Sequence, residues 1–192
     1  GNLGNSHIIK QKNLDVTTEM KFSDVDKEAI VYKVPILTVK ETEELAKTIF
    51  SKQGLSIDAD RNDVYENSAL YYSDGGNRLS VWIDYDGGTF RYTDYDESFG
   101  DEIIVDDNAT EEEIRQALWE IGIYVPNDAC FENIGNGNYQ FVAEYVVDSE
   151  GLYDGVITCT YNGNGKMGNV NYQLLQLDEY KSFPIISEKE AY

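Results

Sequence analysis

Histidine, cysteine and long apolar runs are scarce in this sequence. His7 is the single histidine among 192 residues, and it stands in a polar stretch before the first strand-like segment. Ser-His-Asp and Cys-His catalytic groups and most zinc sites need a histidine in the folded region, so the sequence argues against all of them. No apolar run reaches about 18 residues, the length at which a membrane-spanning helix is predicted.

Basic residues are also few. Lys and Arg number 15 against 36 Asp and Glu, which gives a net charge of −21 at pH 7. A field of this sign repels phosphate backbones and anionic lipid headgroups, so neither nucleic acid nor a membrane surface is an expected partner. We expect contact with a membrane only through an N-terminal anchor that has been removed.

Two acidic segments begin like calcium loops and then depart from that pattern. Residues 58–63 place oxygen ligands on alternate positions, but Asp63 stands where the loop needs glycine and Ala69 where it needs glutamate. Residues 94–98 depart in the same way. An unconventional calcium site and a solvated acidic loop are both compatible with these segments, and the expectation is that no metal is bound.

Other catalytic arrangements find no specific support either. The 36 acidic residues offer too many carboxylate pairs to single out one for glycoside hydrolysis, Asp84 and Asp94 included. No glycine-rich phosphate-binding motif is present. We therefore expect a protein that is not an enzyme and that has no cofactor.

The two cysteines are too few for the disulfide framework of a small secreted fold. Cys130 and Cys159 both lie in or beside strand-like stretches of the second half. Spacing alone does not decide between one bridge joining them and two buried free thiols.

Helix starts are the most informative motifs that are present. Thr38, Thr110 and Ser187 each stand three residues before a glutamate, which is the spacing of a capping box. Apolar residues at helical spacing follow the first two, and Gly54 and Gly122 are suitable terminators. The pattern predicts helices over 38–54 and 110–122. After Ser187 only one turn remains, so this helix either docks as a short plug or opens a third unit that is missing.

After each helix the apolar period changes from near 3.6 to 2, and glycine-rich turns separate the segments. This predicts an α+β fold of two similar units, each an amphipathic helix packed on an antiparallel β-meander. We place a tether or edge segment at residues 1–20, the first unit at 21–106 and the second at 107–192.

Tyrosine is abundant, with 15 residues. Its apolar ring and polar tip suit both half-buried strands and binding surfaces. The predicted binding face on the first sheet comprises Tyr71, Tyr72, Trp82, Tyr85, Tyr92 and Tyr95.

The order of elements, from a Thr38-capped helix to the closing segment Phe183–Tyr192, resembles secreted Firmicutes proteins of the YycH/YycI type and the related PepSY-like modules. The resemblance covers most of residues 30 to 192 and rests on caps and turns. It implies an extracytoplasmic α+β protein without catalysis, of a kind in which the YycH/YycI pair restrains a membrane sensor histidine kinase. The transmembrane helix of that family is not in this sequence, which favours a lipid-anchored relative.

Taken together, the sequence predicts a non-catalytic binding or regulatory module, anchored or secreted at the envelope of a Gram-positive bacterium, that acts through protein contacts. The alternative is a carbohydrate- or cell-wall-binding module that uses aromatic residues of the first sheet.

Overall fold

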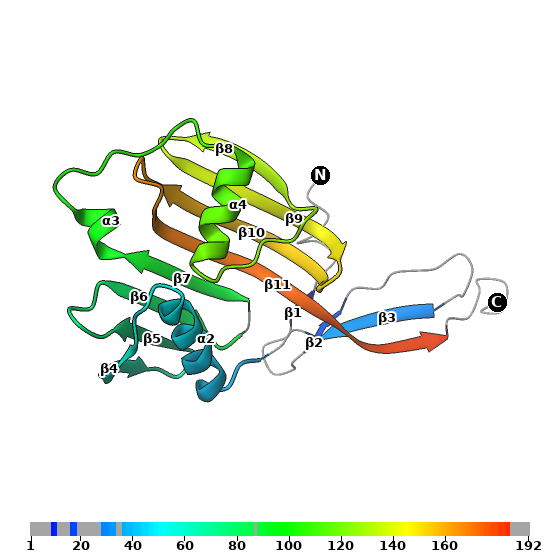
Figure 1. The fold of residues 1–192 in the computed structure, drawn as a ribbon. Helices are drawn as coiled ribbons and strands as arrows, with labels where there is room; N and C mark the ends of the chain where they lie inside the picture. Colours follow the sequence, from blue (N-terminus) through cyan, green and yellow to red (C-terminus); the bar gives the residue numbers. More distant parts are fainter. Residues whose placement is uncertain (1–8, 11–15, 19–27, 34–35, 87, 185–192) are drawn as a thin grey trace.

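The structure is a computed structural model that describes residues 9–10, 16–18, 28–33, 36–86 and 88–184. The chain is α+β, as predicted, with an antiparallel sheet and the two long helices, described next, on one of its faces (Figure 1). The expected helix after Ser187 lies outside the described residues. Within the described ones, no helix is long and apolar enough to cross a membrane.

Helix α2 (Val39–Ser51) begins where the capping box predicts. The Thr38 Oγ1 accepts the Glu41 N–H at 3.1 Å, and the Glu41 Oε1 accepts the Thr38 N–H at 3.2 Å, so two backbone donors of the first turn are satisfied. One face of the helix is buried, through Thr42, Ala46, Ile49 and Phe50. This face packs on the sheet.

Helix α4 (Glu111–Glu120) is confirmed in the second half. Its N-cap is Thr110, whose Oγ1 accepts the Glu113 N–H at 3.2 Å. Ile114 and Leu118 lie on the buried face, and Gly122 ends the helix with a φ of 84°, a conformation that glycine adopts without strain. A third, one-turn helix, α3 (Tyr95–Phe99), was not predicted.

Each of the two long helices precedes four strands. Those after α2 are β4 (Ile57–Val64), β5 (Ser68–Ser73), β6 (Leu79–Asp84) and β7 (Thr89–Asp94). Those after α4 are β8 (Cys130–Gly135), β9 (Asn138–Asp148), β10 (Gly151–Tyr161) and β11 (Met167–Pro184). All pair antiparallel with their neighbours in sequence.

The two runs of strands join into one sheet. Strand β7 pairs with β11, with Tyr92 opposite Val170, so the order across the described strands is β4-β5-β6-β7-β11-β10-β9-β8. The last part of β11 pairs with β3 (Glu28–Lys33), β3 with β2 (Val16–Thr18), and β2 with β1 (Ile9–Lys10). We call the contact between β7 and β11 the seam.

The core lies between the sheet and the two long helices, which share one face of the sheet (Figure 1). Fully buried residues from both halves contribute to it, among them Phe50, Val81, Leu118 and Phe141. Because both helices cover the same face, the alternate side chains of every strand point to the opposite face. That opposite face carries the candidate site.

Candidate functional site

Three of the six predicted aromatic residues belong to the core. Tyr71 and Tyr92 are each 1% exposed on the helix-covered face, and the Tyr71 hydroxyl lies 2.8 Å from the Thr42 Oγ1 of α2. Tyr85 packs partly buried against the same core, with its hydroxyl oxygen buried and without a hydrogen-bond partner. These three side chains therefore pack in the core between the sheet and the helices.

The other three lie on the opposite face. Tyr72 pairs with Ser80 and Trp82 with Leu70 across the β5–β6 hairpin, and paired residues share a face. The Ser80 Oγ donates to the Tyr95 Oη at 3.2 Å, which places Tyr95 beside them. Tyr95 also stacks on Phe99, which is 74% exposed, with ring centroids 6.0 Å apart. Tyr72, Trp82 and Tyr95 thus lie on one face of the sheet, and their role in binding stays a prediction.

A continuous row of side chains crosses the sheet on this face. Each member pairs directly with the next on the neighbouring strand, so the row runs perpendicular to the strands. Its centre is free of carboxylates, which stand only at its two ends. We call it the polar row; from β4 to β8 it comprises Asp63, Leu70, Trp82, Arg91, Asn171, Thr158, Gln140 and Glu132.

A second row lies beside it, two residues along each strand. It contains no charged side chain and comprises Tyr72, Ser80, Thr93, Asn169, Thr160 and Asn138. The two rows together are called the polar face below. Most of their members are half-buried, and Arg91 is exposed.

Hydrogen bonds between neighbouring strands orient these side chains. The Arg91 Nε donates to the Asn171 Oδ1 at 2.9 Å across the seam. The Asn169 Nδ2 donates to the Thr160 Oγ1 at 3.3 Å, and the Thr160 hydroxyl donates to the Asn138 Oδ1 at 2.7 Å. Within the described residues no ion pair involves Arg91, so its terminal nitrogens are available to a ligand.

A pocket of about 480 Å³ opens over the centre of the polar face. Arg91 and Asn171 of the polar row form one side of it, together with three members of the second row, Thr93, Asn169 and Thr160. Helix α3 and the segment after it form the other side, with Glu97 and the apolar side chains of Phe99, Ile103 and Val105. We call this space the Arg91 pocket. It combines hydrogen-bonding groups with an exposed aromatic ring, and its volume lies in the range of small-ligand sites, about 300–1,000 Å³.

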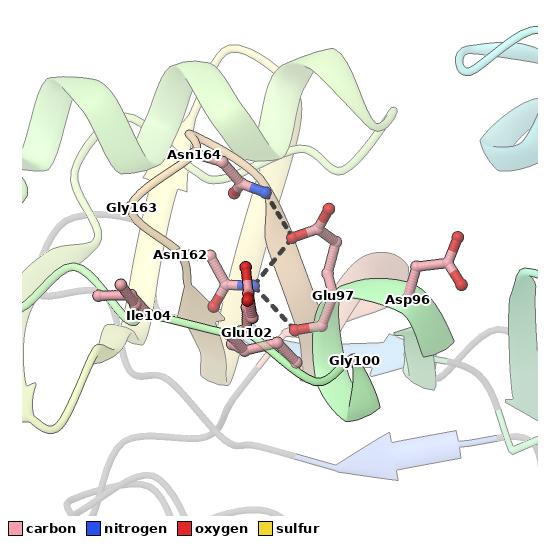
Figure 2. Close-up of a pocket in the computed structure, with 9 residues that line it drawn as sticks. Asp96, Glu97, Gly100, Glu102, Ile104, Asn162, Gly163 and Asn164 are labelled. Carbon is pink, nitrogen blue, oxygen red and sulfur yellow. Dashed lines mark hydrogen bonds between the residues drawn. The ribbon is translucent and has the colours of Figure 1, made fainter.

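A second pocket, of about 540 Å³, lies on the other side of Glu97. Figure 2 shows Asn162 and Asn164 converging on Glu97, while Asp96 points away. The Asn164 Nδ2 donates to the Glu97 Oε2 at 2.7 Å and the Asn162 Nδ2 at 3.1 Å. The Asn162 Oδ1 is buried without a hydrogen-bond partner.

The charge state of Glu97 follows from these contacts. Its side chain is only 12% exposed, and burial alone would raise its pKa. The hydrogen bonds from Asn164 and Asn162 and the charge of Lys166 outweigh burial, so the pKa lies below the ordinary value. Glu97 is therefore an ionised anchor for the loop before β11, and it lacks the raised pKa of a general acid.

Both cysteines are free. Cys130 is exposed on β8 and Cys159 is buried on β10. Strand β9 lies between them, which separates their backbones by about 10 Å, too far for a disulfide. Burial raises the pKa of the Cys159 thiol to about 12, so this group stays protonated and unreactive at neutral pH.

The calcium-like segments have other roles. Asp58, Asp60 and Asp63 lie in β4, at the edge of the described sheet. Asp94 is the N-cap of α3 and pairs with Arg78. In the described part of the chain, no three His, Cys, Asp or Glu side chains are grouped so that they could hold a metal ion.

Comparison of the chain with protein-family models, curated proteins and solved structures gives no match. The resemblance to YycH/YycI and PepSY-like proteins stays a prediction.

Sequence reasoning did not single out the amide and hydroxyl side chains of the polar face. The signal was visible in β11, where Asn169, Asn171 and Gln173 alternate with the apolar Val170, Tyr172 and Leu174. Alternation of this kind shows that one face is polar. It does not show which residues of other strands complete that face.

Proposed function

We propose that this chain is a non-catalytic binding module that holds its ligand on the polar face. The observation that carries the proposal is the polar row, which aligns hydrogen-bonding side chains and Trp82 across eight strands. The Arg91 pocket sits on that row and adds an enclosed volume. Concave sites with a few oriented polar groups are the usual form of ligand sites.

The composition of the polar face supports binding over simple solvation. Asparagine is depleted from strands, yet Asn138, Asn169 and Asn171 occupy central ones. A surface that serves only solubility would carry charges, as the rest of this acidic chain does. The central strands carry Arg91 as their one charge within these two rows.

A duplicated architecture is part of the proposal. We propose that the two halves, residues 21–106 and 107–192, are similar units. Support comes from the element order, because a threonine-capped helix followed by four antiparallel strands occurs twice. The seam then joins the units edge to edge, and the polar face extends over both.

The proposed location is extracytoplasmic, at the envelope of a Gram-positive bacterium, with the chain anchored as a lipoprotein or secreted. This rests on the acidic, polar composition and on the resemblance described above. A ligand of the envelope or the cell wall would meet the module there.

A protein partner is the second candidate, and one specific observation favours it. Ile104 is 77% exposed in a segment, 101–107, that carries four carboxylates and no basic residue. Exposed apolar side chains commonly anchor protein interfaces. This segment lies beside the polar face and forms part of the second pocket.

Retention on an insoluble envelope fraction of a Gram-positive bacterium tests the proposal. We expect Trp82→Ala and Thr158→Val to reduce the retained fraction several-fold. Trp119→Ala is the matched control, because Trp119 is 59% exposed on α4, on the opposite side of the sheet. Equal retention of all variants would rule out the polar face as the binding surface.

Pretreating the envelope with protease separates the two candidates. A wall ligand survives this treatment, and retention then depends on Trp82 and Thr158. If protease abolishes retention and Ile104→Ser weakens it while Trp82→Ala does not, a protein partner at the 101–107 segment replaces the polar face as the conclusion.

A further inference from the structure

We infer that the ligand of the polar face is a neutral glycan chain that lies along the polar row, across the strands. The inference rests on the proposed function and adds the chemical class of the ligand and its direction. Four properties of the surface support it: its hydrogen-bonding groups, its charge, its aromatic rings and its length.

The hydrogen-bonding groups match sugar hydroxyls. An amide side chain both donates and accepts, and so does a hydroxyl. Asn171, Thr158 and Gln140 present three such groups in succession along the row, and Thr93, Asn169 and Thr160 present three more beside them. A sugar hydroxyl also donates and accepts, so neighbouring hydroxyls of a sugar ring can pair with these groups without leaving a charge unmatched.

The charge of the surface excludes polyanions. The chain carries a net charge of −21, and the row ends in Asp63 and Glu132. A nucleic acid or an acidic polysaccharide would be repelled by the whole molecule, and Arg91 alone cannot offset that field. A neutral ligand avoids this repulsion and does not need basic side chains for binding.

The aromatic rings stand where a sugar ring can use them. Trp82 is in the polar row next to Arg91, and Phe99 forms a wall of the Arg91 pocket. Tyr95 stacks on Phe99 and extends that wall. The C–H face of a sugar is apolar, so it gains from contact with such rings while its hydroxyls reach the amides.

The row also has the dimensions of a chain ligand. Strands of a sheet are about 4.8 Å apart, so the six central members from Leu70 to Gln140 span about 24 Å. A peptide is a weaker match, because the backbone groups of these inner strands are paired in the sheet and cannot add a strand. The Arg91 pocket then holds one ring near the centre of the chain.

The experiment uses two β-1,4-linked hexasaccharides as probes, one of glucose and one of N-acetylglucosamine, with polygalacturonate as an anionic control. The chain has two tryptophans, Trp82 and Trp119, so Trp119→Phe leaves Trp82 as the only indole reporter. We expect a neutral hexasaccharide to change its emission and to shield it from a quencher. In Trp82→Ala, where Trp119 is the reporter, no change is expected.

Calorimetry measures the affinity. We expect Trp82→Ala to weaken binding of the neutral probe by about tenfold. Thr158→Val keeps the shape of the side chain and removes its hydroxyl, so it should weaken binding without unfolding the sheet, which circular dichroism checks. Trp119→Phe should bind like the unchanged protein.

The outcomes separate this inference from the proposed function. If neither neutral hexasaccharide binds, or if polygalacturonate binds more tightly, the glycan inference is wrong. In that case envelope retention that still depends on Trp82 and Thr158 leaves the proposed function standing. Neutral-glycan binding that is unaffected in both Trp82→Ala and Thr158→Val would overturn the assignment to the polar row.

Discussion

Replacing Asp94 by asparagine should destabilise the fold more than any other single carboxylate change at the β7–α3 junction. Asp94 is 1% exposed, and its Oδ2 accepts from the Arg78 Nη2 at 2.8 Å and its Oδ1 from the Arg78 Nε at 3.3 Å. The same Oδ1 accepts the backbone N–H groups of Asp96 and Glu97 and so caps α3. The substitution Asp94→Asn keeps the shape of the side chain and removes the charge that serves all four bonds.

The magnitude follows from burial. Removing one partner of a buried ion pair costs about 3–5 kcal/mol, and exposed pairs are worth about 0–1 kcal/mol. The Arg78 side chain is 34% exposed, so solvent offsets part of the loss, and we expect about 2–3 kcal/mol. For a chain of this size that corresponds to a fall in Tm of about 4–12 °C.

Thermal and urea unfolding, followed by near-UV circular dichroism at pH 7, measures the effect. Asp96→Asn is the matched control. Asp96 also pairs with Arg78, but its side chain is 75% exposed and its Oδ2 lies 3.6 Å from the Arg78 Nε, so this ion pair is weaker. We expect the control to stay within about 0.5 kcal/mol of the unchanged protein. If Asp94→Asn stays within the same limit, or if both variants are destabilised equally, the buried ion pair does not stabilise the fold as expected.

Three further predictions concern stability. Thr110→Ala should cost about 0.5–2 kcal/mol in urea unfolding, because the cap of α4 is lost, and no change would mean that this hydroxyl does not stabilise the helix. Tyr71→Phe should lower the free energy of unfolding by about 1 kcal/mol, because the hydrogen bond to Thr42 is lost, and should leave envelope retention unchanged. A loss of retention would mean that Tyr71 contributes to binding. Glu97 has a lowered pKa when folded, so it stabilises the fold above its unfolded pKa near 4.5 and this contribution disappears as pH falls through the lower folded value. Glu97→Gln should therefore flatten the loss of stability as the pH falls below the unfolded pKa, and an unchanged acid profile would contradict the assignment.

The helices could be predicted because their signals are local. Thr38 and Thr110 each cap a helix through a glutamate three residues on, and Gly122 terminates the second one as expected. Only the first cap forms the full reciprocal pair of bonds; at the second, Glu113 contributes its backbone N–H. The α+β class follows from these helices and the period-2 segments after them.

Strands β4 and β8 were not predicted, since neither has the apolar alternation of an inner strand. Residues 57–64 read as an acidic loop, but charges suit a strand at the border of a sheet, where they oppose pairing with another chain. Residues 130–135 are mostly exposed for the same positional reason. In the described sheet each of these two strands pairs with one neighbouring strand, β4 with β5 and β8 with β9, and this pairing holds its backbone extended.

The candidate site was predicted in part and for a physical reason. Tyr71 and Tyr72 are adjacent in a strand, so they must point to opposite faces, and a cluster that contained both could not be one surface. Tyr71, which points toward the helices, is part of the core. The amides were missed because a row across the sheet depends on register between segments such as 89–94 and 169–173, which local patterns do not specify.

The seam joins the two parts of the polar face. Arg91 on β7 and Asn171 on β11 are 80 residues apart in sequence, and their hydrogen bond is the point where the two runs of strands meet on this face. Aromatic side chains gather on the β5–β7 side and amides on the β9–β11 side, so neither run alone offers both stacking and hydrogen bonding. A ligand that needs both kinds of contact must cross the seam. Such a ligand binds only the sheet in which β7 and β11 are paired, so its binding stabilises the pairing of these two strands.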